Sequence, residues 1–354
     1  MSGTWHVVTG DFPPRFSGGV ATWMLGAARA LAGDGGRVVV HARASGIGWT
    51  VAERRFDRTL PFEVHRVAGR SWNARQTAHV ARAVLPRLSA QDRVLAATWT
   101  LAVDLAAPCR DRRVPLVVLA HGSDVTRLGL ATPPGLVALS GSARFLAVSA
   151  FLVRALATHG VSASVVPSPV DPCSISAEAR EGLLVVARLT PLKGVDRALK
   201  LASALGWPIT VAGEGPERTR LGRLAGALGS DAIFTGRREG EALDLLYRRT
   251  ACLVLLSRPD DRGAGAEGLG LVVLEAAARG TPAVVSDVGG LPEAARAGCV
   301  LRDPDDLEAA VDRVCAFLAE VRVGERARAW LAATHGAART REAIRTAAKV
   351  GPCT

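Results

Sequence analysis

The stretch Leu183-Leu-Val-Val-Ala-Arg-Leu-Thr-Pro-Leu-Lys-Gly-Val-Asp196 joins a short apolar run to a polar turn and the start of a helix-length segment. The same alternation continues along nearly the whole chain, which is the pattern of a parallel β-sheet with crossover helices. The fold class that we expect is therefore α/β in both halves. The predicted strands are Trp5–Thr9, Arg37–His41, Phe62–Val67, Val94–Ala97, Leu116–Ala120, Arg144–Val148, Ser164–Val166, Gly182–Ala187, Ile209–Ala212, Ala232–Thr235, Cys252–Leu256, Ala283–Ser286 and Cys299–Leu301.

A length of 354 residues suits two domains, and 49% apolar residues supply both cores. The segment from Ser168 to Glu178 contains two prolines and small polar residues, which is the composition of a linker. We expect an N-terminal domain over residues 1–167, a linker over 168–182 and a C-terminal domain over 183–323. Residues 324–354 are helical in pattern, and we expect this tail to pack back on the first domain.

No apolar run reaches about 18 residues, the length that spans a membrane, and the first residues lack the pattern of a signal peptide. We expect a cytoplasmic protein. The six cysteines show no C-x-x-C spacing, so neither a disulfide framework nor a zinc site is predicted.

Positive charge is concentrated in the first half of the chain. The net charge is +11, and residues 1–171 carry +9 of it. This asymmetry favours an anionic partner, such as a phosphorylated acceptor or an acidic membrane surface. The arginines are scattered and have few aromatic neighbours, so nucleic acid is not the expected partner. A bias in genomic base composition explains the charge equally well, because arginine outnumbers lysine by 41 to 3.

Two carboxylates flank the segment Glu267-Gly-Leu-Gly-Leu-Val-Val-Leu-Glu275. If a helix begins near Gly268, Glu275 lies about two turns inside it, on the side of the helix start, and both carboxylates can face one ligand. An acid in an apolar run needs hydrogen-bond donors, which sugar hydroxyls supply. The alternative is a capping glutamate followed by a structural one.

Arg188 and Lys193 follow a predicted strand, and ligands of open α/β sheets bind at that edge. Two fixed cations there suit a diphosphate. The alternative is a solvated surface pair.

Three further strand ends carry glycine turns or a histidine. Gly18-Gly19 opens a helix after the first strand, His121 follows Ala120, and Gly215 lies in Gly213-Glu-Gly-Pro216. Glycines let the backbone approach a ligand, although each turn can also be purely structural. The chain lacks G-x-G-x-x-G, so a nicotinamide dinucleotide is not indicated. Asp303-Pro-Asp305 is better explained as part of a helix cap at Asp306 than as a metal site.

Taken in order, these motifs resemble the retaining glycosyltransferases of family 4, which have the GT-B fold of two Rossmann-like domains facing each other across a cleft. The resemblance spans nearly the whole chain. It is carried by Gly18-Gly19, His121-Gly122, Arg188 to Lys193-Gly194, Gly213 to Pro216 and Glu267 to Glu275.

The resemblance implies that the second domain binds a nucleotide sugar and the first binds most of the acceptor. Arg188 and Lys193 would hold the diphosphate and stabilise its leaving charge. Glu267 would orient the hydroxyls of the donor sugar, and Glu275 would accept hydrogen bonds from the ribose.

The remaining motifs would complete the donor site. The first domain would bring Gly18 and Gly19 against the diphosphate and His121 against the sugar. Gly215 would pack close to the nucleotide. Neither a metal nor a cofactor would be required. Backbone N–H donors would come from Gly268, Leu269, Gly270 and Leu271.

The implied reaction moves a hexosyl group from a nucleotide sugar to an acceptor hydroxyl, with retention of configuration at the anomeric carbon. A UDP-sugar is the favoured donor, followed by a GDP-sugar. The acceptor would belong to a cell-envelope glycan or glycolipid, or to a natural-product aglycone. The amphipathic segment from Asn73 to Leu88 suits contact with the inner face of an anionic membrane, and equally an ordinary helix covering the sheet. The alternatives are a GT-B nucleotide-sugar epimerase or hydrolase, and a non-catalytic nucleotide-sugar-binding subunit.

Two departures from the family pattern limit what carries over. Pro167-Ser-Pro-Val-Asp171 stands where many relatives have Pro-Asn-Gly-Val-Asp, which removes an amide that could reach the ligand. The stretch from Ser257 to Ala266 is longer and more charged than the usual loop, and it could shape the sugar pocket.

Overall fold

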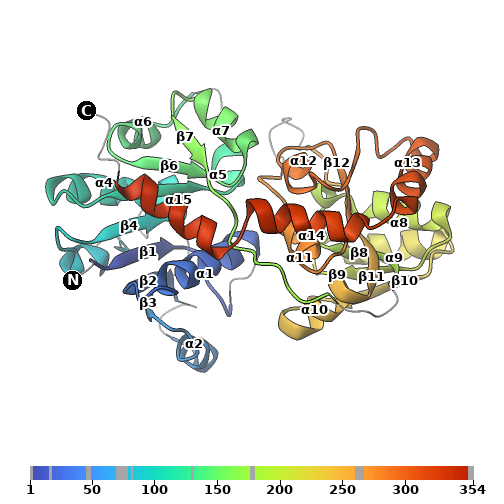
Figure 1. Cartoon of the computed structure of the whole chain (residues 1–354), viewed down its shortest axis with the longest axis horizontal. Helices are drawn as coiled ribbons and strands as arrows, with labels where there is room; N and C mark the ends of the chain where they lie inside the picture. The colour runs from blue at the N-terminus through green and yellow to red at the C-terminus, as the bar shows by residue number, and fades with distance from the viewer. Residues whose placement is uncertain are drawn as a thin grey trace. The chain divides into compact units, whose positions relative to one another are not determined.

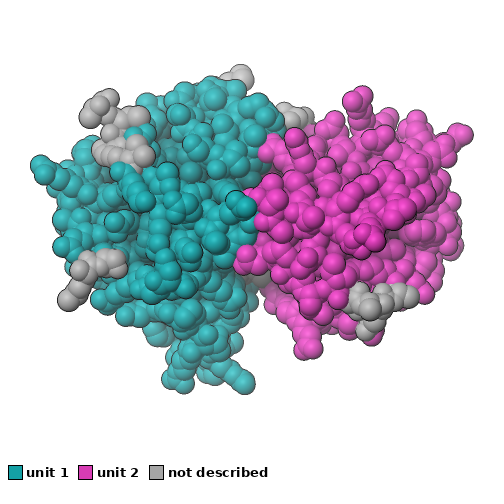
Figure 2. Space-filling view, in the orientation of Figure 1, with its two compact units in different colours: residues 1–169, 335–354 teal, residues 170–334 magenta. Residues whose placement is uncertain are grey.

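The structure, a computed structural model, describes residues 3–15, 18–44, 49–68, 79–80, 83–128, 131–175, 180–259 and 267–349. The chain divides into two compact units (Figures 1 and 2). Unit 1 contains residues 1–169 and 335–354, and unit 2 contains residues 170–334. Each unit has a parallel sheet of its own, with helices connecting successive strands.

Unit 1 is built on a seven-stranded sheet with the order β3-β2-β1-β4-β5-β6-β7. The order reverses between β1 and β4, which is the kind of switch point where open α/β sheets bind ligands. The strands are β1 (Trp5–Thr9), β2 (Val38–Arg43), β3 (Glu63–Val67), β4 (Arg93–Ala96), β5 (Leu116–Ala120), β6 (Arg144–Ala147) and β7 (Ala163–Val165). The helices are α1 (Gly19–Ala32), α2 (Val51–Asp57), the 3-10 turn η1 (Leu85–Arg87), α4 (Trp99–Asp111), α5 (Ser123–Thr126), α6 (Pro134–Ser140), α7 (Ala150–Ala157) and α15 (Ala337–Lys349).

Unit 2 is built on a six-stranded sheet with the order β10-β9-β8-β11-β12-β13, and its switch point lies between β8 and β11. The strands are β8 (Glu181–Val186), β9 (Ile209–Ala212), β10 (Ala232–Gly236), β11 (Thr250–Leu255), β12 (Ala283–Ser286) and β13 (Cys299–Leu301). The helices are the 3-10 turn η2 (Pro191–Lys193), α8 (Val195–Leu205), α9 (Arg218–Ala227), α10 (Gly240–Arg249), α11 (Leu271–Ala278), α12 (Leu291–Ala294), α13 (Leu307–Ala319) and α14 (Val323–Thr334).

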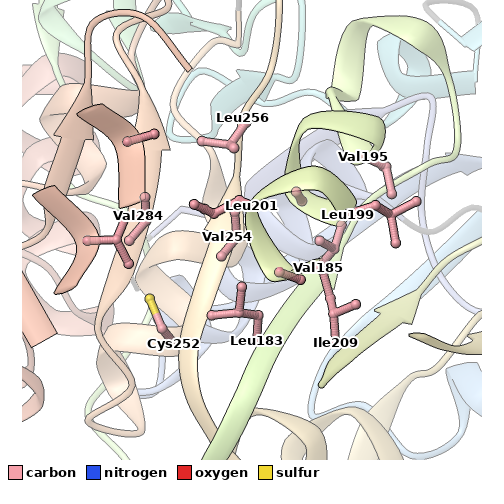
Figure 3. Close-up of a cluster of buried hydrophobic side chains, with 14 of the residues drawn as sticks. Leu183, Val185, Val195, Leu199, Leu201, Ile209, Cys252, Val254, Leu256 and Val284 are labelled. Atoms are coloured by element: carbon pink, nitrogen blue, oxygen red, sulfur yellow. The ribbon is translucent and has the colours of Figure 1, made fainter. Parts of the chain in front are cut away.

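Apolar side chains from the central strands hold α8 against the sheet of unit 2. Figure 3 shows Leu183 and Val185 of β8 in one cluster with Val195 and Leu199 of α8, all of them buried. Burying each such side chain contributes about 1.5–3 kcal/mol. This packing fixes the start of α8, and with it the turn that precedes the helix.

The predicted strands are all present, and their ends differ from the expected ones by at most two residues. The α/β class is thereby confirmed. The amphipathic segment from Asn73 to Leu88 lies partly outside the described residues, and its last part contains η1.

The boundaries of the two units differ from the expected domains. The division falls after Pro169, and α14 belongs to unit 2, where it packs on α11. Only α15 belongs to unit 1, where it packs on α1. Arg345 of α15 donates to both carboxylate oxygens of Asp34, at 2.6 and 2.9 Å. The expected single tail is therefore two helices in different units.

Within the described residues, every helix is too short or too polar to cross a membrane. Five of the six cysteines fall in this part of the chain and are free, and Cys353 lies outside it.

Candidate functional site

Lys193 lies at the carboxyl edge of the unit 2 sheet because Gly194 lets its turn pack against β11. Gly194 has a φ of 59°, in the left-handed region. A Cβ atom there would lie 1.8 Å from the carbonyl oxygen of Leu256. Only glycine satisfies both conditions. The turn that ends η2 is therefore held at the switch point between β8 and β11.

The ammonium of Lys193 forms an ion pair with the carboxylate of Glu267. Ser257, two residues after β11, donates to the same carboxylate oxygen at 3.3 Å, and its own carbonyl accepts from Ser286 at 2.7 Å. The side chains of Lys193 and Glu267 are 24% and 17% exposed, so both are accessible from solvent. Two predicted site residues from distant segments thus meet at one strand end.

The segment after Glu267 is clamped to the loop that follows β12. Gly290 donates its N–H to the Glu267 carbonyl at 2.9 Å. A Cβ atom on Gly290 would lie 2.1 Å from the Gly268 carbonyl oxygen. Gly270, with a φ of 88°, is left-handed and precedes the first residue of α11, Leu271.

The expected helix start near Gly268 is therefore wrong. Helical geometry cannot pass through a left-handed residue, so α11 begins at Leu271. Glu275 consequently lies about one turn inside the helix instead of two.

Glu275 has a partner that differs from those of Glu267. The Tyr247 hydroxyl of α10 donates to Glu275 Oε2 at 2.8 Å. Burial raises the pKa of Glu275, whereas the Tyr247 hydrogen bond and the charge of Arg279 act in the opposite direction. Glu275 itself is partly buried. The two predicted carboxylates thus belong to separate hydrogen-bonded groups.

Arg188 and Gly215 are brought together beyond the ends of β8 and β9. Leu189 donates its N–H to the Glu214 carbonyl at 2.8 Å, which joins the two turns. A Cβ atom on Gly215 would lie 2.3 Å from the Leu189 carbonyl oxygen, so this close approach requires glycine. Arg188 is exposed beside these packed turns.

Sequence reasoning missed a second pair that flanks Lys193. Arg258 donates to both carboxylate oxygens of Asp196, at 2.7 and 2.9 Å. The backbone N–H of Arg258 also donates to the Leu192 carbonyl at 2.8 Å. These bonds tie the segment after β11 to both sides of the Lys193 turn. No local pattern links residues so far apart in the sequence. The adjoining residues 260–266 of the long charged stretch lie outside the described residues.

In unit 1, Gly18 and Gly19 lie at the start of α1. Gly18 has a φ of 135°, and a Cβ atom on either residue would meet no heavy atom within 4 Å. Among the described residues, the space around these two Cα atoms is therefore open.

His121 lies directly after β5, with the Trp23 ring of α1 edge-on at 5.2 Å. Burial lowers the pKa of His121 to about 4, so the imidazole is neutral near pH 7. Asp124 accepts from the N–H groups of His121 and Gly122, at 3.1 and 2.8 Å. Burial raises the pKa of Asp124 to about 6.

Asp303, Asp305 and Asp306 have structural partners. Asp305 forms an ion pair with Arg197, and its backbone N–H donates to Asp303 Oδ1 at 3.0 Å. Asp306 caps α13 by accepting from the Ala309 N–H at 3.2 Å. Among the described residues, no group of three or more His, Cys, Asp or Glu side chains could hold a metal ion.

Two family models match successive parts of the chain. The family model of Glycosyltransferase Family 4 matches residues 17–173, and that of Glycosyl transferases group 1 matches residues 174–330. A relative from Mycobacterium tuberculosis, a GDP-mannose-dependent α-(1-6)-phosphatidylinositol monomannoside mannosyltransferase, is 32% identical over 44% of this chain and 43% of its own length. An uncharacterised glycosyltransferase of Methanocaldococcus jannaschii is 35% identical over 37% of this chain and 35% of its own length. The matched part thus spans less than half of these curated relatives.

Solved structures resemble the chain over nearly its full length. Anabaena HepE in complex with UDP and glucose has a TM-score of 0.73 at 17% identity, covering 97% of this chain and 98% of that one. AviGT4, a glycosyltransferase involved in avilamycin A biosynthesis, has a TM-score of 0.72 at 19% identity, covering 98% and 97%. At these identities the likeness shows the fold. With the two family models covering residues 17–330 between them, the chain belongs to the family 4 glycosyltransferases and has the GT-B fold.

Proposed function

We propose that the protein is a retaining, metal-independent glycosyltransferase that moves a hexosyl group from a nucleotide diphosphate sugar to an acceptor hydroxyl. The observation that carries the proposal is the Lys193–Glu267 ion pair at the switch point of the unit 2 sheet. A cation suited to phosphate and a carboxylate suited to sugar hydroxyls are adjacent there, as a sugar diphosphate requires.

The chemistry follows from these two groups and Arg188. The bond between the anomeric carbon and the diphosphate oxygen breaks, and the charge left on the diphosphate is stabilised by Lys193 and Arg188. The acceptor oxygen forms the new bond on the same face of the sugar. Its proton passes to the departing diphosphate, so no protein base is needed for this step. Glu267 orients the sugar by accepting from its hydroxyls.

The other predicted residues complete donor binding in the same proposal. Glu275 accepts from the ribose hydroxyls. The N–H groups at the start of α11 face the phosphate and sugar, where a helix N-terminus favours negative charge. In unit 1, the open loop at Gly18 and Gly19 admits the diphosphate, and neutral His121 donates a hydrogen bond to the sugar. The N–H groups belong to Gly268, Leu269, Gly270 and Leu271, and Gly215 supports the nucleotide.

Two donor nucleotides are supported by the relatives. HepE was solved with UDP and glucose, whereas the M. tuberculosis relative is named for GDP-mannose. We favour a UDP-sugar, followed by a GDP-sugar. The acceptor belongs to a cell-envelope glycan or glycolipid, as the phosphatidylinositol mannoside acceptor of that relative suggests, or to a natural-product aglycone, as AviGT4 suggests.

Unit 1 also has a surface that supports contact with an anionic membrane. Trp49 is 43% and Val51 73% exposed at the start of α2, which lies beyond the β3 edge of the sheet (Figure 1). Arg54 and Arg55 of the same helix are exposed. An indole, an aliphatic side chain and cations together suit a negatively charged interface.

A thermal-shift panel tests the donor class. We would compare UDP, GDP, ADP, dTDP, UDP-glucose, UDP-N-acetylglucosamine and GDP-mannose, each with and without EDTA. A ligand at 100 times its dissociation constant stabilises a protein by about 2.7 kcal/mol. A shift with one nucleotide that survives EDTA supports the proposal, and no shift with any of them contradicts it. Product analysis without acceptor then separates transfer from hydrolysis or epimerisation of the donor.

A further inference from the structure

Tyr247 is the only tyrosine in the chain, and its hydroxyl binds a residue of the proposed donor site. The side chain comes from α10 and is 1% exposed. A buried phenol hydroxyl needs a hydrogen-bond partner, because leaving it unpaired costs about 1–3 kcal/mol. The partner here is Glu275 Oε2 of α11, at 2.8 Å.

A group of polar contacts fixes Tyr247 and Glu275 relative to each other. The Arg279 guanidinium lies over the Tyr247 ring, 5.2 Å from its centre. Arg279 also donates to the Glu275 carbonyl oxygen at 2.8 Å and to Asp244 Oδ1 at 2.5 Å. At the other end of the residue, Thr281 donates to the Tyr247 carbonyl at 2.6 Å. The ring therefore has one orientation in which its hydroxyl is satisfied.

The geometry leaves Glu275 able to bind a ligand as well. A carboxylate offers two oxygens and about four acceptor positions. The Tyr247 hydrogen bond uses one position on Oε2, and Oε1 is not involved in it. Glu275 is only partly buried, although the tyrosine behind it is fully buried. The hydroxyl that binds the carboxylate thus belongs to the more deeply buried of the two residues.

The hydroxyl also acts on the charge of Glu275. Burial raises the pKa of this carboxyl group, and the Tyr247 hydrogen bond opposes that rise by stabilising the ionised form. A protonated Glu275 would donate one hydrogen and offer weaker acceptors to ribose hydroxyls.

We propose that Tyr247 is a positioning residue for the nucleotide, whose hydroxyl orients Glu275 and keeps it ionised as the acceptor for the ribose. This inference rests on the proposed function of Glu275. Tyr247 acts through the carboxylate and does not itself touch the donor. The groups that face Glu275 in this arrangement are Tyr247 of α10 and Arg279, which directly follows α11, with Asp244 behind Arg279.

The first test is Tyr247→Phe, which keeps the ring under Arg279 and removes only the hydroxyl. We expect the dissociation constants of UDP and GDP, measured by calorimetry, to rise about tenfold for whichever of them the protein binds, as for loss of one hydrogen bond to a charged group. In steady-state assays KM for the sugar nucleotide should rise more than kcat falls. Nucleotide binding should also begin to weaken at a higher pH than in the parent, because Glu275 is protonated more easily.

Thr281→Val is the matched control. It removes a buried hydroxyl that donates to the Tyr247 carbonyl and accepts from Arg180, and it leaves the Glu275 carboxylate untouched. If Tyr247→Phe acted only by loosening the contact between α10 and α11, Thr281→Val would produce a similar loss of affinity. Neither loss would then depend on pH. That result would overturn the inference.

Glu275→Gln separates the inference from the proposed function on which it rests. If Tyr247 acts through Glu275, the double variant should bind UDP or GDP no more weakly than Glu275→Gln alone, because the effects are not additive. Unchanged affinity in Glu275→Gln would remove the ribose role, and the inference with it. If Glu275→Gln binds the nucleotide more weakly while Tyr247→Phe keeps the affinity and pH profile of the parent, the inference about Tyr247 is overturned. The ribose role of Glu275 then still stands.

The single tyrosine also allows a readout that is independent of activity. Protein labelled with ¹³Cζ-tyrosine gives one tyrosine signal in the NMR spectrum. We expect its chemical shift to follow the protonation of Glu275 as the pH is lowered, and this titration to disappear in Glu275→Gln. A signal with the same chemical shift in the parent and in Glu275→Gln at every pH would show that the hydrogen bond does not form in solution, which contradicts the inference.

Discussion

Lys193 and Glu267 form an ion pair although 74 residues separate them in the chain. The contact joins the turn after β8 to the segment before α11, across the switch point of the unit 2 sheet. Without a donor, each charge neutralises the other. In the proposed function a bound sugar diphosphate replaces this contact, with phosphate at Lys193 and sugar hydroxyls at Glu267. When the donor binds, each of the two charged side chains thus gains a new partner, and neither charge is left unpaired.

Replacing Lys193 by methionine should reduce transfer by at least about a hundredfold, because it removes a cation that stabilises the leaving diphosphate. The fold should remain, since an ion pair near the surface contributes about 1 kcal/mol or less. Single-turnover transfer assays and thermal unfolding measure the two effects. Lys200→Met, on the exposed face of α8, is the control and should behave like the parent. Full activity in Lys193→Met would exclude this lysine from catalysis.

Gly194→Ala should destabilise unit 2 and weaken binding of the nucleotide sugar. The new Cβ would lie 1.8 Å from the Leu256 carbonyl oxygen at a φ of +59°, so the Lys193 turn must move away from β11. We expect a loss of about 1–3 kcal/mol in the free energy of unfolding, measured by denaturant titration.

Gly206→Ala separates the steric effect from backbone strain. Gly206 has a φ of +66°, but a Cβ atom there would meet no heavy atom of the described residues within 4 Å. This variant should lose about 1 kcal/mol, from the left-handed conformation alone, and keep donor binding. Equal effects of the two substitutions on donor binding would argue against a role for the contact with Leu256.

The strands and the Lys193 and Glu267 segments could be predicted because their signals are local. Apolar runs bounded by glycine and polar turns mark strand ends, and ligands of such sheets bind there. Tyr247 could not be found in this way, because one aromatic residue in a helical pattern predicts only a core position. Its bond to Glu275 depends on how α10 and α11 pack. The start of α11 was misplaced because the left-handed φ of Gly270 cannot be read from a sequence containing two nearby glycines.

Trp49→Ala combined with Arg54→Gln and Arg55→Gln should weaken binding to vesicles that contain phosphatidylglycerol. Each basic side chain near an anionic surface contributes about 1 kcal/mol, so the two arginines alone predict about a thirtyfold lower partition coefficient in sedimentation assays. Val321→Ser, at a position 79% exposed in unit 2, is the control and should not alter partitioning. Equal binding of all three proteins would exclude α2 as the contact surface.

The stability of unit 1 should fall as the pH falls below about 6.5, because its buried histidines resist protonation. His41 Nε2 lies 2.9 Å from His6 Nδ1, and the His41 ring stacks on His65 at 5.6 Å. Burial, with the neighbouring histidines, lowers the pKa of His41 to about 3, and burial lowers that of His6. Between pH 6.5 and these lower values the unfolded chain binds more protons than the folded one. His41 then costs about 1.4 kcal/mol per pH unit, and His6 contributes in the same direction.

One group in the same unit acts in the opposite direction. The pKa of Asp124 is raised to about 6, so below that pH the folded state binds this proton before the unfolded state does, and stability is gained. His41→Phe keeps a ring in the stack and removes one of the histidine contributions. At pH 7.5 we expect this variant to have a lower free energy of unfolding, because the hydrogen bond to His6 is lost. Between pH 6 and 4.5 it should reduce the pH dependence of the free energy of unfolding by about 1.4 kcal/mol per pH unit. Urea unfolding at several pH values measures this slope, and an unchanged slope would mean that His41 is protonated in the folded protein.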